Sequence, residues 1–494
     1  MKLSNLKFAN IITVIAFLSL SLTTLSCKEE VAPQPDKKLA ITNIEPIAGC
    51  AETEITITGE NFSLAVNSSG NSTNVVKIGN TIMTLIGFST TKLKFRIPFS
   101  MAAGTYPVTI TVGNNTVEYP QKFTVQPLPT TYPAEVESYN YVIGTQNIGA
   151  SYKFTGDSKL IEPAKRMWEM GSNIMKIHLG YSTNTAAELQ KVGNENKMII
   201  DMPFNHYFFW VYTDYNQWWK DGMSASDSIA EYSNMYNLTK YLLQTYNNTN
   251  KKFYFGHWEG DWLLTETNPA MTAVDPVRIK GMIDWLNIRQ RAIDQAKLDV
   301  PHSNVDVFHY VEVNRVVDAM QNNYDRIANR ILPYTNVDFV SYSSYDAIGH
   351  SDYSSTNSAL VSALNYIESK LKPKPSISGK RVFIGEYGYA LIGSDGVSVQ
   401  NSATAQNTRS KYVMKSAITW GCPFVLYWEM YNNEVVNGVQ RGFWLINDKN
   451  EKQPIYYTHE NFIKAGKAWV NNYFTTNKKL PSYDEFKAWA ITSL

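Results

Sequence analysis

Beyond residue 133 the sequence alternates short apolar runs with segments that have the periodicity of amphipathic helices. This alternation predicts parallel strands linked by helices. Eight strands are expected, at Tyr141–Gly144, Ile174–His178, Met198–Met202, Phe253–His257, Val305–Val311, Phe339–Tyr342, Val382–Gly385 and Phe424–Trp428. Eight strand–helix units match a (β/α)8 TIM barrel in number and order. An open doubly wound sheet is the alternative, but no glycine-rich phosphate loop follows the first strand. We therefore expect an α/β barrel over residues 134–494.

The expected helices fall between these strands. One of them places Leu160, Ile161, Ala164, Met167 and Trp168 on a single face. A second is expected over residues 277–297, and a third over residues 408–420, where Gly421 and Pro423 end it.

A smaller β domain is expected to precede the barrel, over residues 39–127. Residues 54–59, 93–97 and 106–112 alternate with period two, and helical periodicity is absent, so an immunoglobulin-like β-sandwich is the expected fold. The run Ile55–Phe62, with Pro46 and Gly49 before it and Gly104 after it, resembles the IPT/TIG domain. That resemblance implies a spacer or, less commonly, a glycan-binding module.

The N-terminus has the pattern of an export signal. Lys2 and Lys7 precede the apolar run Ile11–Leu22, which is too short to span a bilayer. The residues leading to Cys27 resemble a bacterial lipobox, and the Lys-Glu-Glu that follows resembles the surface-export signal of Bacteroidota lipoproteins. This resemblance implies a signal peptide over residues 1–26, a lipidated Cys27 with a linker to residue 38, and an outer-membrane lipoprotein on the cell surface. Plain secretion is the alternative.

Composition excludes several classes of partner. Lys plus Arg total 45 against 44 Asp plus Glu, and no basic cluster appears, so a nucleic-acid binder is not expected. Three cysteines are too few and too scattered for a disulfide scaffold or a Cys-rich zinc site. The chain contains 31 Tyr, 21 Phe and 12 Trp. An aromatic content this high favours a flat ligand such as a sugar, which can stack on the faces of the rings.

Two glutamates follow strands that lie across the expected barrel. Glu259 comes after the fourth strand and Glu386 after the seventh, and barrels of this type keep their active sites at the carboxyl ends of their strands. Paired carboxyl groups cleave glycosidic bonds: one protonates the leaving oxygen and the other attacks the anomeric carbon, at a separation of about 5 Å in retaining enzymes. The mutual field of two close carboxyls keeps one of them protonated.

These strand ends resemble those of clan A glycoside hydrolases. The motif Ile384–Gly388 and the Leu-Tyr-Trp that ends at Trp428 carry the resemblance. It implies that Glu259 is the acid/base, that Glu386 is the nucleophile, and that Trp428 lies under the reacting sugar. The segment Gly171–Ile177 resembles a clan segment with Lys176 in place of Arg, and the resemblance implies that Tyr342 or Tyr345 bonds the nucleophile.

The sequence departs from the clan at the residue before the acid/base. Trp258 occupies the position where the clan has an Asn that contacts the sugar 2-hydroxyl, so we expect either that Asn314 supplies the contact or that the reacting sugar is unusual at this position. The departure indicates a divergent family.

Several expectations remain open at the site. Asp261 and Glu312 are rivals of Glu259 for the role of acid/base, and Glu312 is alternatively a partner of Lys176. His257 is expected to contact substrate, and with Glu259 and Asp261 it forms the one conceivable metal site, although one strand rarely supplies a whole coordination sphere. Residues 204–219 are expected to form a loop whose tryptophans, with Trp210 foremost, stack on sugar.

The expected function is retaining, internal cleavage of a β-linked polysaccharide, with no cofactor and no metal. The expected partners are the glycan itself, the outer membrane through the lipid, and a glycan-import complex. The alternatives are a non-catalytic surface glycan-binding protein and a metal-dependent hydrolase centred on His257 and Asp261.

Overall fold

The structure is a computed structural model and describes residues 38–68 and 70–494. The expected signal peptide and Cys27 lie outside the described residues. Within the described range, no helix combines the length and the hydropathy needed to cross a bilayer.

Residues 40–125 form a β-sandwich whose strands pair antiparallel, with one exception. Its strands are β1 (Ala40–Glu45), β2 (Ala48–Gly49), β3 (Glu54–Glu60), β4 (Val75–Ile78), β5 (Thr81–Ile82), β6 (Leu85–Phe88), β7 (Lys92–Arg96), β8 (Gly104–Tyr106), β9 (Val108–Val112), β10 (Asn115–Glu118) and β11 (Phe123–Val125). They form sheets of order β1-β3-β7-β6 and β10-β9-β4-β5, with a small third sheet β2-β11-β8 in which β2 and β11 are parallel. Ile55, Ile57, Leu93 and Phe95 alternate with more exposed residues and lie in the core, as period-two patterning requires.

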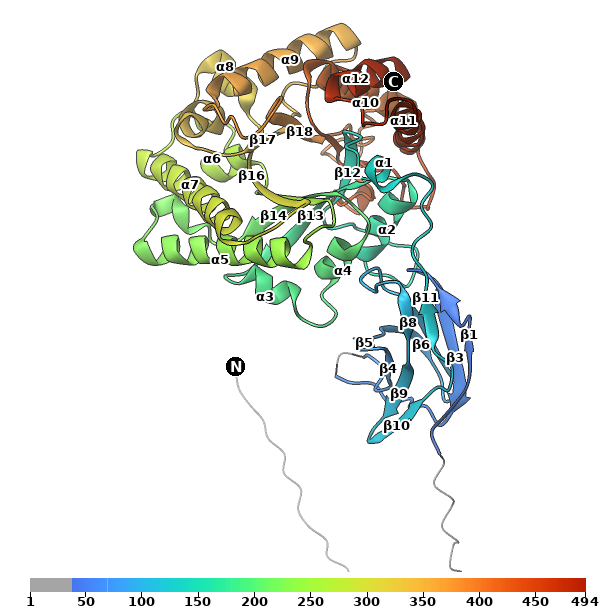
Figure 1. Ribbon diagram of the computed structural model, residues 1–494. Coiled ribbons are helices and arrows are strands. Elements are labelled where there is room, and N and C mark those ends of the chain that lie inside the picture. The colour runs from blue at the N-terminus through green and yellow to red at the C-terminus, as the bar shows by residue number, and fades with distance from the viewer. Residues whose placement is uncertain (1–37, 69) are drawn as a thin grey trace, which may run out of the picture.

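The second domain is a closed barrel of eight parallel strands (Figure 1). The strands are β12 (Ile143–Asn147), β13 (Ile174–Tyr181), β14 (His206–Tyr212), β15 (Lys251–Gly256), β16 (Val305–Val313), β17 (Phe339–Ser343), β18 (Val382–Tyr387) and β19 (Val425–Tyr427). The expected fold class, a (β/α)8 barrel preceded by an immunoglobulin-like β-sandwich, is confirmed.

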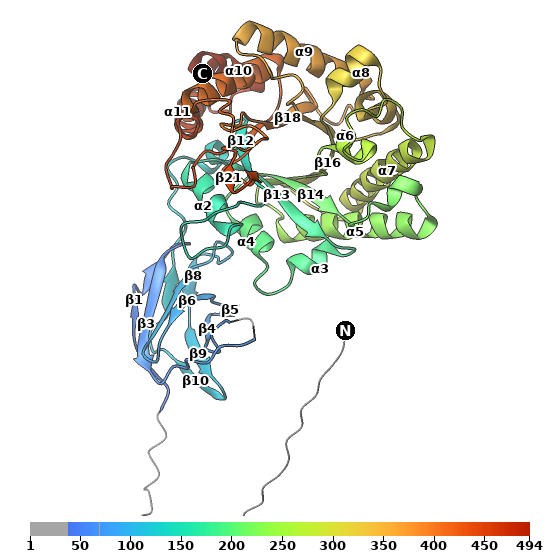
Figure 2. The same ribbon diagram turned by 180° about the vertical axis from the view of Figure 1, so that it is seen from behind.

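Helices surround the barrel on its outer side (Figure 2). They are α1 (Ala134–Glu137), α2 (Ile161–Glu169), α3 (Thr185–Leu189), α4 (Glu195–Asp201), α5 (Ala225–Thr245), α6 (Gly260–Thr265), α7 (Pro276–Asp299), α8 (Val316–Asn322), α9 (Tyr353–Lys370), α10 (Ala403–Trp420), α11 (Pro454–Asn477) and α12 (Tyr483–Ser493). Short 3₁₀ and π turns lie at Trp218–Asp221, Ile327–Ile331 and Leu332–Tyr334, and a hairpin of β20 (Val435–Val436) and β21 (Val439–Gln440) follows the last strand.

The prediction of the third barrel strand was wrong. Residues 198–202 belong to α4, which the Asn194 side chain caps, and the strand is β14, inside the segment expected to be a loop. A short apolar run fits a buried helix as well as a strand. The real strand is buried along its whole length, so it lacks the alternation that marks a half-exposed strand.

Aromatic rings fill the centre of the barrel. Phe208 on β14 contacts Phe383 on β18 and Phe424, the residue just before β19, with ring centroids 5.1 and 4.8 Å apart. Strands on opposite sides of a closed barrel meet only through its interior, so Phe383 points inward. By period-two alternation, its neighbours Val382 and Ile384 therefore point outward rather than into the barrel.

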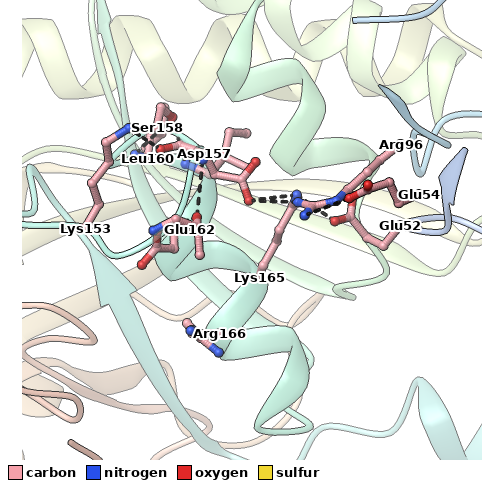
Figure 3. Close-up of polar contacts among 12 residues, drawn as sticks. Glu52, Glu54, Arg96, Lys153, Asp157, Ser158, Leu160, Glu162, Lys165 and Arg166 are labelled. Carbon is pink, nitrogen blue, oxygen red and sulfur yellow. Dashed lines mark hydrogen bonds and ion pairs between the residues drawn. The ribbon is translucent and has the colours of Figure 1, made fainter. Parts of the chain in front are cut away.

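The sandwich and the barrel contact each other beside α2 (Figure 3). Lys165 Nζ lies 2.6 Å from Oε2 of Glu52 in the sandwich and 3.0 Å from Oδ2 of Asp157 in the barrel. Phe99 packs edge-on against Trp168, with centroids 5.2 Å apart. An ammonium group shared by two carboxylates and an aromatic contact thus join the domains.

Candidate active site

A buried ammonium group lies at the carboxyl end of the barrel. Lys176 on β13 reaches across the interior, and its Nζ lies 3.0 Å from Glu312 Oε2 on β16 and 3.1 Å from Glu386 Oε1 on β18. It also donates a hydrogen bond to the carbonyl of Gly385 at 3.2 Å. All three charged side chains are at most 3% exposed. Burial alone would lower the pKa of Lys176, but the two carboxylates raise it, so the ammonium form persists.

A register irregularity brings Glu386 to this cluster. Tyr342 on β17 pairs with Ile384, but the next residue, Ser343, pairs with Glu386, so Gly385 is the extra residue of a bulge. A Cβ atom at Gly385 would lie 1.6 Å from the Ser341 hydroxyl oxygen, so only glycine fits there. The bulge changes the alternation and turns Glu386 inward.

Ser343 connects the two glutamates expected to be catalytic. Its Oγ lies 2.6 Å from Glu259 Oε1 and 3.4 Å from Glu386 Oε2. The two carboxylate oxygens can therefore be no further apart than the sum of these distances, about 6 Å. That upper limit on one oxygen–oxygen distance is compatible with the spacing of about 5 to 5.5 Å typical of retaining glycosidases.

The chain turns sharply to place Glu259 at this point. Glu259 caps α6 with φ 17° and ψ 74°, and its backbone N–H donates to Glu312 Oε1 at 2.9 Å. Gly260 follows in a space where a Cβ would lie 2.3 Å from Ile327. Glu312 therefore holds the backbone of Glu259 with one oxygen and binds Lys176 and the Ser341 hydroxyl with the other.

Electrostatics favour different protonation states for the two glutamates. Burial raises the pKa of Glu259 to about 7, and the charges of Glu312 and Asp261 act in the same direction. Burial also raises the pKa of Glu386 above its usual range, while the ammonium of Lys176 opposes that shift. Such a pair titrates as a unit. Since the ammonium contacts Glu386 and only a neutral hydroxyl contacts the Glu259 side chain, the charge is favoured on Glu386 and the proton on Glu259.

Several other predicted residues surround the glutamate pair. Trp210 covers Lys176 at 4.8 Å from ring centroid to Nζ, and its ring lies 6.2 Å from that of Trp428. The indole N–H of Trp428 donates to Glu434 at 3.2 Å. The Tyr345 hydroxyl lies near enough to both glutamates for their charges to contribute to raising its pKa, after burial.

Asn314 and Trp258 lie on the Glu259 side of the pair. Asn314 Oδ1 accepts the backbone N–H of Asp261 at 2.9 Å. Trp258 is half-buried, and its backbone N–H donates to the Tyr212 hydroxyl at 2.7 Å.

The structure does not bring Tyr342 or His257 to the pair. Tyr342 is buried, and its hydroxyl donates to Asp346. Period-two alternation instead turns Ser341 and Ser343 inward. His257 is fully buried against Trp285 of α7, and its ring nitrogens bond the Trp258 carbonyl and the Glu312 N–H. Burial lowers the pKa of His257 to about 3, which favours the neutral form of the ring.

Asp261 does not share a face with Glu259. The chain leaves β15 at Gly256, so strand alternation no longer applies, and Asp261 lies within α6. Its carboxylate accepts three backbone N–H groups, from Asn314, Arg315 and Ile327, at 2.7 to 3.0 Å. Among the described residues, no three His, Cys, Asp or Glu side chains gather in an arrangement suited to a metal ion.

Sequence reasoning missed Ser343 and Ser341. The signal was present in the stretch Ser341–Ser344, where period two places these two serines on the face opposite Tyr342. The register of the seventh strand, which decides the partner of Ser343, depends on the bulge at Gly385.

Residues 39–125 match the family described as IPT/TIG domain. The sandwich is therefore confirmed as a domain of this type. No curated protein matches the sequence.

Solved structures resemble the chain at low identity. One is a family 39 glycoside hydrolase from the gut symbiont Bacteroides cellulosilyticus WH2, at 10% identity and a TM-score of 0.44, covering 87% of this chain and 83% of that one. Another is an exo-β-1,4-mannosidase from Opitutaceae bacterium strain TAV5, at 10% identity and a TM-score of 0.44, with coverages of 66% and 60%. A third is a β-D-glucuronidase from Dictyoglomus thermophilum, at 10% identity and a TM-score of 0.40, with coverages of 87% and 69%. These similarities are too distant to assign a reaction.

Proposed function

We propose that this protein is a retaining glycoside hydrolase that cuts a β-linked polysaccharide internally. The observation that supports the proposal is the pair Glu259 and Glu386, which contact one Ser343 hydroxyl at the carboxyl end of the barrel. A protonated carboxyl beside an ionised one, at this spacing, is what double displacement at an anomeric carbon requires.

The reaction would proceed in two steps. Lys176 holds Oε1 of Glu386, so Oε2, which faces Ser343, attacks the anomeric carbon as the glycosidic bond breaks. Glu259 gives its proton to the leaving oxygen, and a glycosyl ester forms on Glu386. Glu259 then takes a proton from water, whose oxygen attacks the same carbon and releases Glu386. Atoms and charge balance without a cofactor.

The test is release of reducing ends from β-glucans, mannans, xylans and galactans. We expect activity on one class, and we expect Glu386→Gln to lower kcat by at least about 10³-fold. Glu259→Gln should slow natural substrates strongly but spare an aryl glycoside, whose leaving group needs no proton. Glu188→Gln, an exposed site, is the control. A 2-fluoro glycoside of the active class should leave a covalent adduct on Glu386.

The second candidate is a glycan-binding protein without catalysis. The observation in its favour is the closure of the site, since Glu386 is 2% exposed and Glu259 8% exposed. It predicts glycan binding, no release of reducing ends from the whole panel, and no adduct on Glu386.

We also propose that the protein is tethered at the outer surface of the cell by an acylated Cys27 and supplies a glycan-import complex. The support is the residue pattern around Cys27. Cys27→Ser should move the protein from the membrane fraction to the soluble fraction, whereas an unchanged membrane fraction would contradict lipid anchoring.

A further inference from the structure

A continuous row of aromatic rings leads from the glutamate pair to the protein surface. It begins with Trp210, whose ring lies over Lys176. His178 follows, with its ring centroid 6.3 Å from Trp210 and 5.2 Å from Tyr181. Tyr181 is 5.0 Å from Tyr215. These residues belong to the carboxyl ends of β13 and β14 and to the loop after β14, so the row lies at the same end of the barrel as the glutamates.

The outer end of the row is exposed. Tyr181 is 46% exposed and Tyr215 is 72% exposed. Exposed aromatic surface next to a catalytic centre is typical of a ligand-binding groove. Tyr181 stacks on the buried Tyr212 at 5.1 Å, which fixes its ring. The Tyr212 hydroxyl in turn accepts the N–H of Trp258, the neighbour of Glu259. The exposed rings are thus connected to Lys176 through Trp210. They are also connected to the neighbour of Glu259 through Tyr212.

Two polar atoms within the row have no hydrogen-bond partner among the described residues. They are Nε2 of His178 and Nε1 of Trp210, and both are buried. Trp210 as a whole is only 6% exposed. An unpaired buried polar group is destabilising, and a ligand hydroxyl placed nearby would restore the missing hydrogen bond. A pyranose ring offers both features that the row calls for, an apolar C–H face and hydroxyl groups around its edge.

We propose that Tyr181 and Tyr215 form a stacking platform for a sugar ring beyond the reacting one, with His178 and Trp210 bonding hydroxyls of the chain between platform and glutamates. This inference rests on the proposed function and specifies its substrate as an extended β-linked oligosaccharide. The platform adds binding energy for every substrate long enough to reach it, and it adds none for a single sugar.

Kinetics with substrates of two lengths test the platform. The probes are cellohexaose, mannohexaose and xylohexaose, each beside its 4-nitrophenyl β-monoglycoside. We expect Tyr181→Ala and Tyr215→Ala each to lower kcat/KM for the active hexasaccharide about tenfold, the equivalent of about 1.4 kcal/mol, and to leave the aryl glycoside within about twofold. Tyr181→Phe and Tyr215→Phe keep the ring and should behave like the unmodified protein.

The matched control is Tyr334→Ala. Tyr334 is 61% exposed and lies before β17, at the opposite end of the barrel, so its loss should affect neither substrate. Equal losses on the hexasaccharide and the aryl glycoside, or no loss on the hexasaccharide, would overturn the platform.

A binding assay tests the platform independently of catalysis. Affinity electrophoresis in gels containing barley β-glucan, glucomannan or xylan should retard both the unmodified protein and Glu386→Gln, and should not retard the double variant Tyr181→Ala/Tyr215→Ala. If the double variant is retarded as strongly as the unmodified protein, or if no gel retards the unmodified protein, the platform is wrong. If binding follows the tyrosines but no substrate is cleaved, the platform holds and the hydrolase proposal fails.

Discussion

Glu259 and Glu386 share one hydroxyl group: Ser343 Oγ lies 2.6 Å from the first carboxylate and 3.4 Å from the second. A serine hydroxyl has a single hydrogen, so it can donate to one carboxyl only while accepting from the other. Ser343 donates its single hydrogen to Oε1 of Glu259, which lowers the pKa of that carboxyl, and Oε2 of Glu386 lies beside the same hydroxyl.

Ser343→Ala removes this connection. Because the Ser343 hydrogen bond lowers the pKa of Glu259, we expect its loss to raise that pKa and to move the basic limb of the kcat/KM profile to higher pH. The activity at the optimum should fall about tenfold or more, because the two carboxyls lose the group that positions them. Ser343→Thr keeps a hydroxyl and is the control. A Ser343→Ala profile identical to that of the unmodified protein would show that the hydroxyl has no part in setting the protonation state.

Activity should decline as pH rises through about 7. Glu259 must be protonated to act as the acid, and its pKa is about 7 in the folded protein. The same shift affects stability. The folded protein holds a proton on Glu259 that the unfolded chain releases near its reference pKa of about 4.3, so the stabilisation is complete below that pH and is lost as pH rises to about 7. Thermal unfolding at pH 5 and pH 8 should therefore show a smaller loss of Tm for Glu259→Gln than for the unmodified protein. Equal losses would contradict the raised pKa.

Lys176→Gln should destabilise the barrel strongly. The change leaves Glu312 and Glu386 buried without their counter-ion, and breaking a buried ion pair from one side costs about 3 to 5 kcal/mol. Urea unfolding measures the loss. Lys197→Gln, which breaks the partly exposed pair with Asp201, is the control and should cost about 1 kcal/mol or less. If both variants lose the same stability, the buried cluster does not depend on the ammonium.

Chelators should leave the activity unchanged. The carboxylate that the metal-dependent alternative requires, Asp261, already accepts three backbone N–H groups that hold residues 314, 315 and 327 in place. Dialysis against EDTA, followed by an assay with and without added divalent ions, checks this. Asp261→Asn should instead lower Tm, since an amide replaces one acceptor oxygen with a donor that faces a backbone N–H. Loss of activity on chelation with recovery on adding zinc would revive the metal-dependent hydrolase.

Lys165→Glu should loosen the contact between the domains. The change places a third carboxylate beside Glu52 and Asp157, and these side chains are about 15 to 23% exposed, so repulsion is only partly screened by water. X-ray scattering should show a larger maximum dimension than for the unmodified protein, with the barrel's activity on small substrates retained. Lys191→Glu, on an exposed pair with Glu188, should change neither.

The sequence predicted the barrel because its signal is repeated eight times, and an error in one unit does not change the architecture. The third unit shows this: residues 198–202 were taken for a strand and form a helix, yet the count of eight held, because β14 lies a few residues further on. The sandwich was predictable for a similar reason, since several short segments alternate with period two. Element type follows from local patterning, whereas the orientation of a fully buried strand has no local signature.

The residue types of the site and the strands that carry Glu259 and Glu386 were determined by the sequence alone, because catalytic residues of a barrel follow the ends of its strands. Tertiary structure decided which neighbours these glutamates have. The bulge at Gly385 turns Glu386 toward Lys176 and Ser343, and the turn after β15 withdraws His257 and Asp261 from the site. These outcomes depend on contacts between segments more than 40 residues apart, as in the pairing of Ser343 with Glu386. No local pattern in the chain encodes the register that brings such segments together.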